Sequence, residues 1–283
     1  METWIIFVLF YGVLKGLREP IKKRLLRDIS VLSALFGYTF IGFLMSVPTA
    51  SGVFSFPPHL FFFIAVKSLS VFVAWILSFI GIKKIPVSTY GIFDMSRVIF
   101  STLLGVAFFH ESLTVKGVAS LLLVIGGLYF ANRKKVATKE QYEYKYVWYV
   151  LLSCFFNAIS GMMDKYIMST GEITSSALQF WFMLLLSVFY LVYMLIKKEK
   201  IELKKIFTNP WTYLLSFSLI FGDRLLFIAN SNPNSKVTIM TLLKQSSSVI
   251  TLLCGKFIYK EKNMLRKALC ILVIVAGIVL SVL

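Results

Sequence analysis

Acidic residues are scarce in this chain, because its 283 residues contain 13 Asp and Glu against 30 Lys and Arg. Cysteine is rarer still, and the three cysteines, Cys154, Cys254 and Cys270, lie in apolar stretches without paired or metal-ligand spacing. We therefore expect neither a disulfide framework nor a metal site. The chain also lacks the glycine-rich, phosphate-binding loop that ends in Lys-Ser or Lys-Thr. Its absence argues against a function driven directly by nucleotide hydrolysis. We also predict that no cofactor is bound.

Apolar residues are abundant instead, at 58% of the chain with a mean hydropathy of +0.81, against roughly 45–50% in a soluble domain. A helix needs about 20 apolar residues to cross the hydrocarbon core. The sequence predicts ten such helices, at residues 3–18, 29–47, 60–82, 86–108, 113–131, 146–167, 174–195, 211–229, 237–258 and 264–283. The connections are too short for a soluble catalytic domain, so we predict that the protein is not an enzyme.

The net charge of +17 would indicate a nucleic-acid partner in a soluble protein, but here the basic residues have a membrane pattern. Of the 30 Lys and Arg, 22 fall at alternate connections, in residues 18–27, 83–84, 133–145, 197–205 and 256–267. Because short basic loops stay cytoplasmic, this bias predicts that both termini lie outside. The charges are equally compatible with binding lipid headgroups. We expect membrane lipids as partners and no nucleic acid.

Two stretches of the chain, residues 85–130 and 236–280, repeat one pattern. Shifted by 150 residues, Gly105 falls on Gly255, Glu111 on Glu261 and Lys116 on Arg266. The duplication predicts repeats at 1–131 and 146–283, joined by a basic loop at 132–145. Internal repeats of this kind build binding sites at their interface in many transporters. Glu111 and Glu261 are interpreted as first-turn acids, which the positive end of a helix favours.

Five cations lie within the predicted spans, where a charge costs at least ~2.5–3.5 kcal/mol at the bilayer centre unless it faces a partner or a cavity. They are Lys15, Lys67, Arg97, Arg224 and Lys244. We weigh two acids of the spans with them, Asp94 and Asp223. Asp94 precedes Arg97 by three residues, which allows a pair along one helical face. Asp223 and Arg224 are adjacent and point roughly 100° apart, so each is expected to address a different partner.

The repeat shift places Asp94 on Lys244, which puts opposite charges at equivalent depth in the fourth and ninth spans. We interpret them as a cross-repeat pair that either locks the repeats together or serves substrate or proton coupling. Lys67 lies close enough to the end of its span to snorkel to the interface, and this interpretation is favoured over a site role.

Weaker polar candidates complete the predicted substrate site. Asn157 lies in mid-span and is expected to face the interior, because an unpaired amide in lipid is unfavourable. Gln245 and Tyr90 adjoin Lys244 and Asp94 and are candidate cavity residues. The run Ser246-Ser247-Ser248 could bind a ligand, but helix packing is the favoured interpretation.

The motifs Ile85-Pro86-Val87-Ser88, Glu111-Ser112-Leu113-Thr114 and Ile125-Gly126-Gly127 resemble an EamA-type repeat of the drug/metabolite transporter superfamily. The stretch from Pro233 through Val275-Ala276-Gly277-Ile278 is similar. The resemblance implies an all-α integral membrane protein with ten transmembrane helices as two inverted five-helix repeats. It also implies alternating access, a cavity lined by the third, fourth, eighth and ninth helices, and a bacterial inner-membrane location.

Two departures from the superfamily bear on chemistry and orientation. Many members are placed with both termini in the cytoplasm, and the small multidrug resistance relatives use an acid in the first helix, where this chain has Lys15. Five cations against two acids favour an anion, a zwitterion or a phosphate headgroup as substrate. We predict a secondary-active transporter of a small polar or anionic metabolite, coupled to a proton or a counter-substrate. The alternatives are a flippase for a phosphate-bearing lipid such as a polyprenyl phosphate and, third, a membrane scaffold or receptor.

Overall fold

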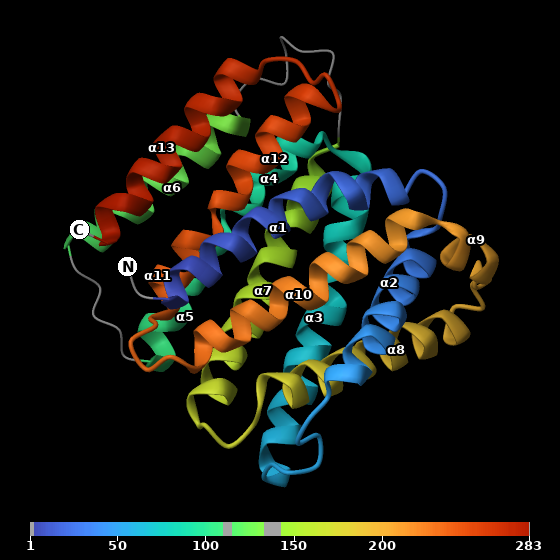
Figure 1. Cartoon of the computed structure of the whole chain (residues 1–283). Helices are drawn as coiled ribbons and strands as arrows, with labels where there is room; N and C mark the ends of the chain where they lie inside the picture. The colour runs from blue at the N-terminus through green and yellow to red at the C-terminus, as the bar shows by residue number, and fades with distance from the viewer. Residues whose placement is uncertain (1–2, 110–114, 133–142, 283) are drawn as a thin grey trace.

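The computed structural model describes residues 3–109, 115–132 and 143–282, and the described part of the chain contains helices and no strands (Figure 1). The first half forms α1 (Thr3–Leu25), α2 (Val31–Ser46), the short η1 (Val47–Thr49), α3 (Pro58–Lys84), α4 (Val87–Asp94), α5 (Arg97–Phe109) and α6 (Val115–Asn132). The second half forms α7 (Tyr144–Ser169), α8 (Ser175–Ile196), α9 (Leu203–Thr208), α10 (Pro210–Ser231), α11 (Val237–Lys244), α12 (Ser246–Phe257) and α13 (Met264–Val282). The predicted turn at Glu111 and most of the predicted loop 132–145 lie outside the described residues.

Several of these helices are built to cross a membrane. Among the described residues, six segments are long and apolar enough: Val31–Thr49, Pro58–Lys84, Val87–Phe108, Tyr144–Ser169, Ser175–Ile196 and Pro210–Ser231. Their outer surfaces carry large apolar side chains, such as Phe217 at 57% exposure, and so does α13, with Leu272 at 62%. Such surfaces are expected where the surrounding solvent is lipid. The protein is therefore a multi-pass membrane protein.

Local sequence signals set several helix starts. Ser30 accepts a hydrogen bond from Ser33 N, and Thr174 accepts one from Ala177 N, so each caps the helix that follows. Asn209 caps α10 in the same way, with Pro210 in the first helical position. Each cap satisfies a backbone N–H that the helix leaves without a partner.

The fourth and ninth spans are broken, whereas the sequence predicted continuous helices at 86–108 and 237–258. One helix stops at Asp94 and the next begins at Arg97; the other stops at Lys244 and resumes at Ser246. At the first break Met95 N donates to Ile92 O and Ser96 N donates to Phe93 O. The backbone hydrogen bonds there join residues three apart, as in a 3₁₀-helix, instead of four apart. Hydropathy alone does not detect such a change. Asp94 and Lys244 are equivalent under the 150-residue shift, so both repeats break at the same place.

Helix pairing follows the duplication. α3 packs on α7 and α1 packs on α10, and each of these pairs becomes the other when the two halves are exchanged. The pairs α6–α13 and α2–α8 map onto themselves, α4–α12 exchanges with α5–α11, and Figure 1 shows α6 and α13 side by side. Two copies of one helical unit related by a two-fold exchange produce this pattern.

The connections gather at two ends of the bundle. At one end Ser30 Oγ donates to Glu199 Oε1 at 2.7 Å, Lys23 donates to Ile85 O, and Tyr259 Oη donates to Pro20 O at 2.7 Å. At the other end Thr174 Oγ1 donates to Ser51 O at 2.9 Å, and Lys165 Nζ donates to Ser235 Oγ at 2.8 Å. The first end holds the basic connections, so the charge asymmetry of the sequence is also an asymmetry in space.

Glu261 has a different role from the one predicted. Its carboxylate accepts from Val87 N at 2.6 Å, from Ser88 N at 3.1 Å and from the Ser88 hydroxyl. It therefore caps α4 of the first repeat rather than the helix that follows it in sequence. Pro86 at the N-cap of α4 has no side-chain oxygen to offer, and Glu261 supplies the missing acceptor.

A close approach joins α1 to the second repeat. Gly12 and Gly16 form a small-residue stripe on α1 that faces the region of Ser246 and Ser247. A Cβ at Gly16 would lie 2.6 Å from the backbone carbonyl oxygen Ser247 O and 2.6 Å from Ile250 Cβ. Neither atom is the far end of a flexible side chain, so α1 and α12 would have to separate. The packing interpretation of the serine run agrees with this contact.

We expect Gly16→Ala to lower stability by about 1–3 kcal/mol, because extra volume in a tight contact forces a backbone shift. Gly126→Ala in α6 is the matched control, since a Cβ there meets nothing within 4 Å. The melting temperatures of both variants in one detergent test the contact. A Gly16→Ala protein as stable as the Gly126→Ala protein would contradict it.

Candidate functional site

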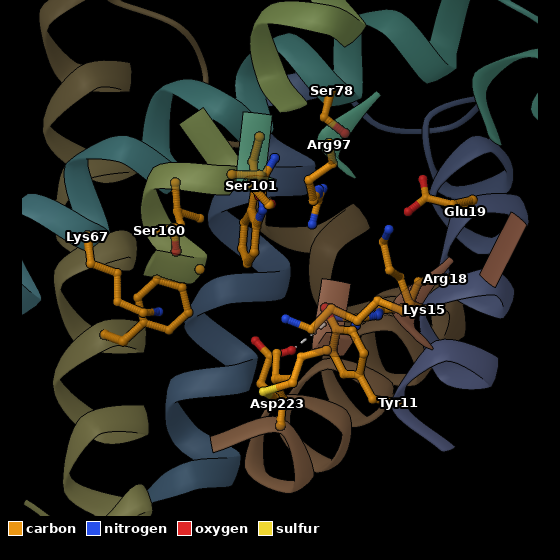
Figure 2. A pocket seen from close by; sticks show the side chains of 18 of the residues that line it. Tyr11, Lys15, Arg18, Glu19, Lys67, Ser78, Arg97, Ser101, Ser160 and Asp223 are labelled. Atoms are coloured by element: carbon orange, nitrogen blue, oxygen red, sulfur yellow. Dashed lines mark hydrogen bonds and ion pairs between the residues drawn. The ribbon is translucent and has the colours of Figure 1, made fainter. Parts of the chain in front are cut away.

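One polar cavity lies at the meeting point of the two halves, with a volume of about 90 Å³. Figure 2 shows Lys15, Arg18, Lys67, Arg97 and Asp223 turned towards a common space. Helices α1, α3, α5, α7, α10 and α11 supply most of the lining, with single residues from α2, α4 and α8. The polar lining residues are Tyr11, Lys15, Arg18, Glu19, Lys22, Tyr38, Lys67, Ser78, Tyr90, Arg97, Ser101, Asn157, Ser160, Asp223, Asn230 and Lys244.

The first helix provides the largest share of charge. Tyr11, Lys15, Arg18 and Lys22 follow at steps of four, three and four residues, which places them on one helical face. The predicted span ends at residue 18, so Arg18 and Lys22 were expected in a basic loop. Both belong to α1, and Arg18 is only 6% exposed. The helical spacing of these residues could have identified Arg18 and Lys22 as part of the helix. Hydropathy ended the predicted span at residue 18, so this spacing was not used.

Asp94 is the acid at the centre of the cation cluster. It forms an ion pair with Lys15, and Arg97 Nη2 lies 3.2 Å from Asp94 Oδ1. The predicted Asp94–Arg97 pair is therefore present, while the predicted Asp94–Lys244 pair is wrong. Equivalent depth in two repeats does not fix the rotation of each helix, and α1 brings Lys15 between them. In the described part of the chain, Lys244 has no ion-pair partner and lies 5.9 Å from the centroid of the Tyr11 ring.

Asp223 and Arg224 address different partners, as expected for adjacent helical residues. Asp223 Oδ1 lies 3.4 Å from Arg18 Nη1 inside the cavity. Arg224 turns away from it: Nε donates to Gln179 Oε1 at 2.7 Å, and Nη2 donates to Thr49 Oγ1 at 3.1 Å. Arg224 therefore does not line the cavity, although the sequence pattern predicted it in the substrate site.

Lys67 is a buried cavity residue and does not snorkel. Its Nζ lies 3.1 Å from Asp164 Oδ1 and 3.1 Å from the centroid of the Phe182 ring, and the residue is 1% exposed. The snorkelling interpretation rested on the distance of Lys67 from the end of its span. Asp164 of α7, which the site prediction omitted, holds the ammonium inside. Only the packing of α3 on α7 brings the two together.

The remaining predicted residues are divided between the cavity and its surroundings. Tyr90 and Asn157 line the cavity; Tyr90 Oη is 2.6 Å from Ser78 Oγ, and Asn157 Nδ2 donates to Ser153 O at 2.8 Å. Gln245 is 1% exposed at the helix break beside Lys244, and its amide has no hydrogen-bond partner among the described residues. It lies near the cavity but outside its lining.

Charge in and around the cavity does not balance. Lys15, Arg18, Lys22, Lys67, Arg97 and Lys244 line it, while Glu19 and Asp223 line it and Asp94 and Asp164 pair with its cations. Six cations face four acids, which leaves two positive charges uncompensated. Unpaired charge in a water-poor interior is unfavourable. The arrangement is suited to hold an anion.

Comparisons with known proteins agree with this architecture. The model of the EamA-like transporter family matches residues 2–133 and 144–283. The chain belongs to the EamA-like transporter family. The resemblance to the drug/metabolite transporter superfamily is confirmed, and the chain is a membrane transporter of that superfamily. No curated protein matches it.

Solved structures share the fold. Matches extend to 28 chains, and one of them is described only as "Crystal structure of protein". It aligns over 99% of this chain and 97% of its own, with a TM-score of 0.72 and 11% identity. At that identity the likeness concerns the fold alone.

Proposed function

We propose that this EamA-family protein is a secondary-active, alternating-access transporter of a small polar or anionic metabolite. The observation that carries the proposal is the cavity between the two halves, with its surplus of two buried positive charges. Ligand pockets for drug-sized molecules occupy about 300–1,000 Å³, so a cavity of about 90 Å³ favours a small solute. A proton or a counter-substrate would couple the cycle to a gradient.

Ten transmembrane helices in two inverted repeats, at residues 1–131 and 146–283, are part of this proposal, as is a bacterial inner-membrane location. The breaks after Asp94 and Lys244 support alternating access, because both residues lie at or beside the cavity. Each break separates a short helix from a longer one. The two equivalent hinges would let each repeat move at one end of the cavity while the other end stays closed.

A flippase for a phosphate-bearing lipid is the second candidate, and the excess of buried cations favours it as well. A lipid substrate requires basic residues along an opening towards the bilayer. Lys15, Arg18 and Lys67 are instead 5%, 6% and 1% exposed. Burial of these three cations supports a solute over a lipid.

Counterflow in proteoliposomes tests the proposal. Vesicles containing the purified protein are loaded with one unlabelled solute from a panel of amino acids, nucleosides, sugar phosphates and dicarboxylates. We expect labelled anionic solute to accumulate only where the same class is inside. Accumulation no faster than in protein-free vesicles for every class would refute the transport proposal.

Arg97 is expected to serve the substrate through its geometry as well as its charge. Arg97→Lys keeps the charge but loses the planar fork, and hydrogen bonds to charged groups contribute about 1.5–3 kcal/mol. We therefore expect roughly a tenfold or larger loss of counterflow. Arg224→Lys is the matched control, because Arg224 bonds to Gln179 and Thr49 outside the cavity. Equal rates for the Arg97→Lys protein and the wild type would return Arg97 to a structural role beside Asp94.

Orientation is predicted from the basic end of the bundle, with both termini outside. We expect Ser55→Cys to react with an impermeant thiol reagent on intact cells, and Thr208→Cys to react only after permeabilisation. Neither change alters the count of basic residues, and Cys154, Cys254 and Cys270 are buried, which limits background labelling. The opposite labelling pattern would reverse the orientation.

A further inference from the structure

Arg18 lines the cavity with two guanidinium nitrogens that have no hydrogen-bond partner among the described residues. Its Nη1 faces Asp223 at a long 3.4 Å, while Nε and Nη2 are buried and lack any hydrogen-bond partner in the part of the chain that the structure describes. These two nitrogens form the side-on edge of a guanidinium, which binds carboxylate or phosphate through two parallel hydrogen bonds. A buried donor left without an acceptor is unfavourable. The vacant edge therefore points to a ligand with paired acceptor oxygens.

Two more donors face the same space from other helices. Arg97 uses Nη2 for Asp94, and its Nε has no partner among the described residues. Lys244 lies 5.9 Å from the Tyr11 ring, and the Arg18 guanidinium lies 5.1 Å from the same ring. Arg18 and Lys244 thus flank one aromatic side chain, although α1 and α11 belong to different repeats. A ligand held by both would connect the two halves.

The charge balance fixes the valence of that ligand. Two positive charges remain after the four acids are counted. A monoanion would leave one buried cation uncompensated, whereas a dianion neutralises the cluster. The cavity volume of about 90 Å³ requires both charges on one compact group. A phosphate monoester meets these demands, since it carries about −1.5 to −2 charges at pH 7 and offers three acceptor oxygens.

We infer that the cavity binds the dianionic phosphate group of a phosphate monoester, with Arg18 as the fork and with Arg97 and Lys244 as further cations. The inference rests on the proposed transport function and names its substrate class. A soluble phosphate ester and a lipid with a phosphate monoester headgroup present the same chemistry. The experiment separates these two sources.

Isothermal titration of the purified full chain uses glycerol 3-phosphate as the probe, with glycerol and chloride of matched ionic strength as controls. The second pKa of a phosphate monoester is about 6, so the dianion fraction rises about tenfold between pH 5 and pH 7. We expect the affinity for glycerol 3-phosphate to rise by a similar factor. Sulfate is a dianion throughout this range, and its affinity reports any titration of the protein itself. A glycerol 3-phosphate affinity that follows sulfate in its pH dependence overturns the valence assignment.

Variants test the named residues. Arg18→Lys keeps the charge and removes the fork, and we expect it to weaken glycerol 3-phosphate binding at least about tenfold. Arg224→Lys is the matched control and should bind as the wild type does. Lys244→Met provides an independent test if Arg18→Lys does not fold, and it should also bind at least about tenfold more weakly. Unchanged binding in the folded variant overturns the inference, and so does wild-type binding of both glycerol 3-phosphate and phosphatidic acid that is no stronger than that of chloride.

A final comparison identifies the source of the phosphate. Phosphatidic acid in nanodiscs carries the same headgroup on acyl chains, and competition with glycerol 3-phosphate for one site supports the phosphate assignment. Direct binding of phosphatidic acid nanodiscs, with no binding of glycerol 3-phosphate, supports the lipid source and the flippase. Phosphate binding without counterflow would leave the inference standing and refute the transport proposal. Counterflow of a neutral solute without phosphate binding would do the reverse.

Discussion

Asp94→Asn is expected to destabilise the protein by about 3–5 kcal/mol, because removing one partner of a buried ion pair leaves the other charge uncompensated. The effect falls at the upper end of this range because two cations depend on one carboxylate. Lys15 is paired with Asp94, and Arg97 lies 3.2 Å from it. The melting temperature and the folded yield in detergent measure the loss.

A double-mutant cycle identifies the true partner. Lys15→Met combined with Asp94→Asn should cost clearly less than the sum of the two single changes, since the pair is removed together. Lys244→Met combined with Asp94→Asn should be additive, because Lys244 lies against Tyr11 and not against Asp94. Coupling of Asp94 to Lys244 and not to Lys15 would restore the cross-repeat pair that the repeat register suggested.

The contrast between these two cycles shows where the sequence is informative. The 150-residue register placed Asp94 and Lys244 at equivalent positions, and both residues end a helix in the structure. Register along the chain was therefore predictable. The direction in which each side chain points was not, because it depends on helix rotation and on which third helix packs between them. Lys15 of α1 takes the partner that the repeat register assigned to Lys244.

A second limit of the sequence prediction was the use of hydropathy windows to decide where a membrane span ends. Such windows end a span where charges accumulate, so the last turns of α1 were assigned to a loop. A polar cavity changes that rule, since charged residues on one face of a membrane helix are tolerated when they face a cavity. The steps from Tyr11 to Lys15, Arg18 and Lys22 follow one face and would have extended the helix. Glu19 lies beside them at 5% exposure and pairs with Lys22 at 2.8 Å.

Partners from distant helices were the hardest features to foresee. Asp164 and Lys67 are 97 positions apart in sequence, and nothing local to either one names the other. A lone charge in a span predicts that some partner exists, and that much was available. Its identity required the packing of α3 against α7, while the packing of α3 against α8 sets Phe182 against the ammonium.

The Lys67–Asp164 pair provides the second large effect. Lys67→Met leaves a buried carboxylate and Asp164→Asn leaves a buried ammonium, so each should cost about 3–5 kcal/mol. The two changes together remove both charges, and a buried ion pair replaced by groups of similar volume is often neutral. We therefore expect the double variant to melt near the wild type. The long, flexible Met side chain can occupy the space against Phe182 that the lysine stem fills.

Counterflow of the same three variants separates a structural pair from one that serves transport. A pair that only locks α3 to α7 predicts that the double variant regains transport together with stability. We expect stability to return without transport, because Lys67 lines the cavity and supplies one of its six cations. Removing both charges keeps the surplus at two positive charges but takes the Lys67 ammonium out of the cavity. Full recovery of both properties would remove Lys67 from the substrate site and leave the anion to Arg18, Arg97 and Lys244.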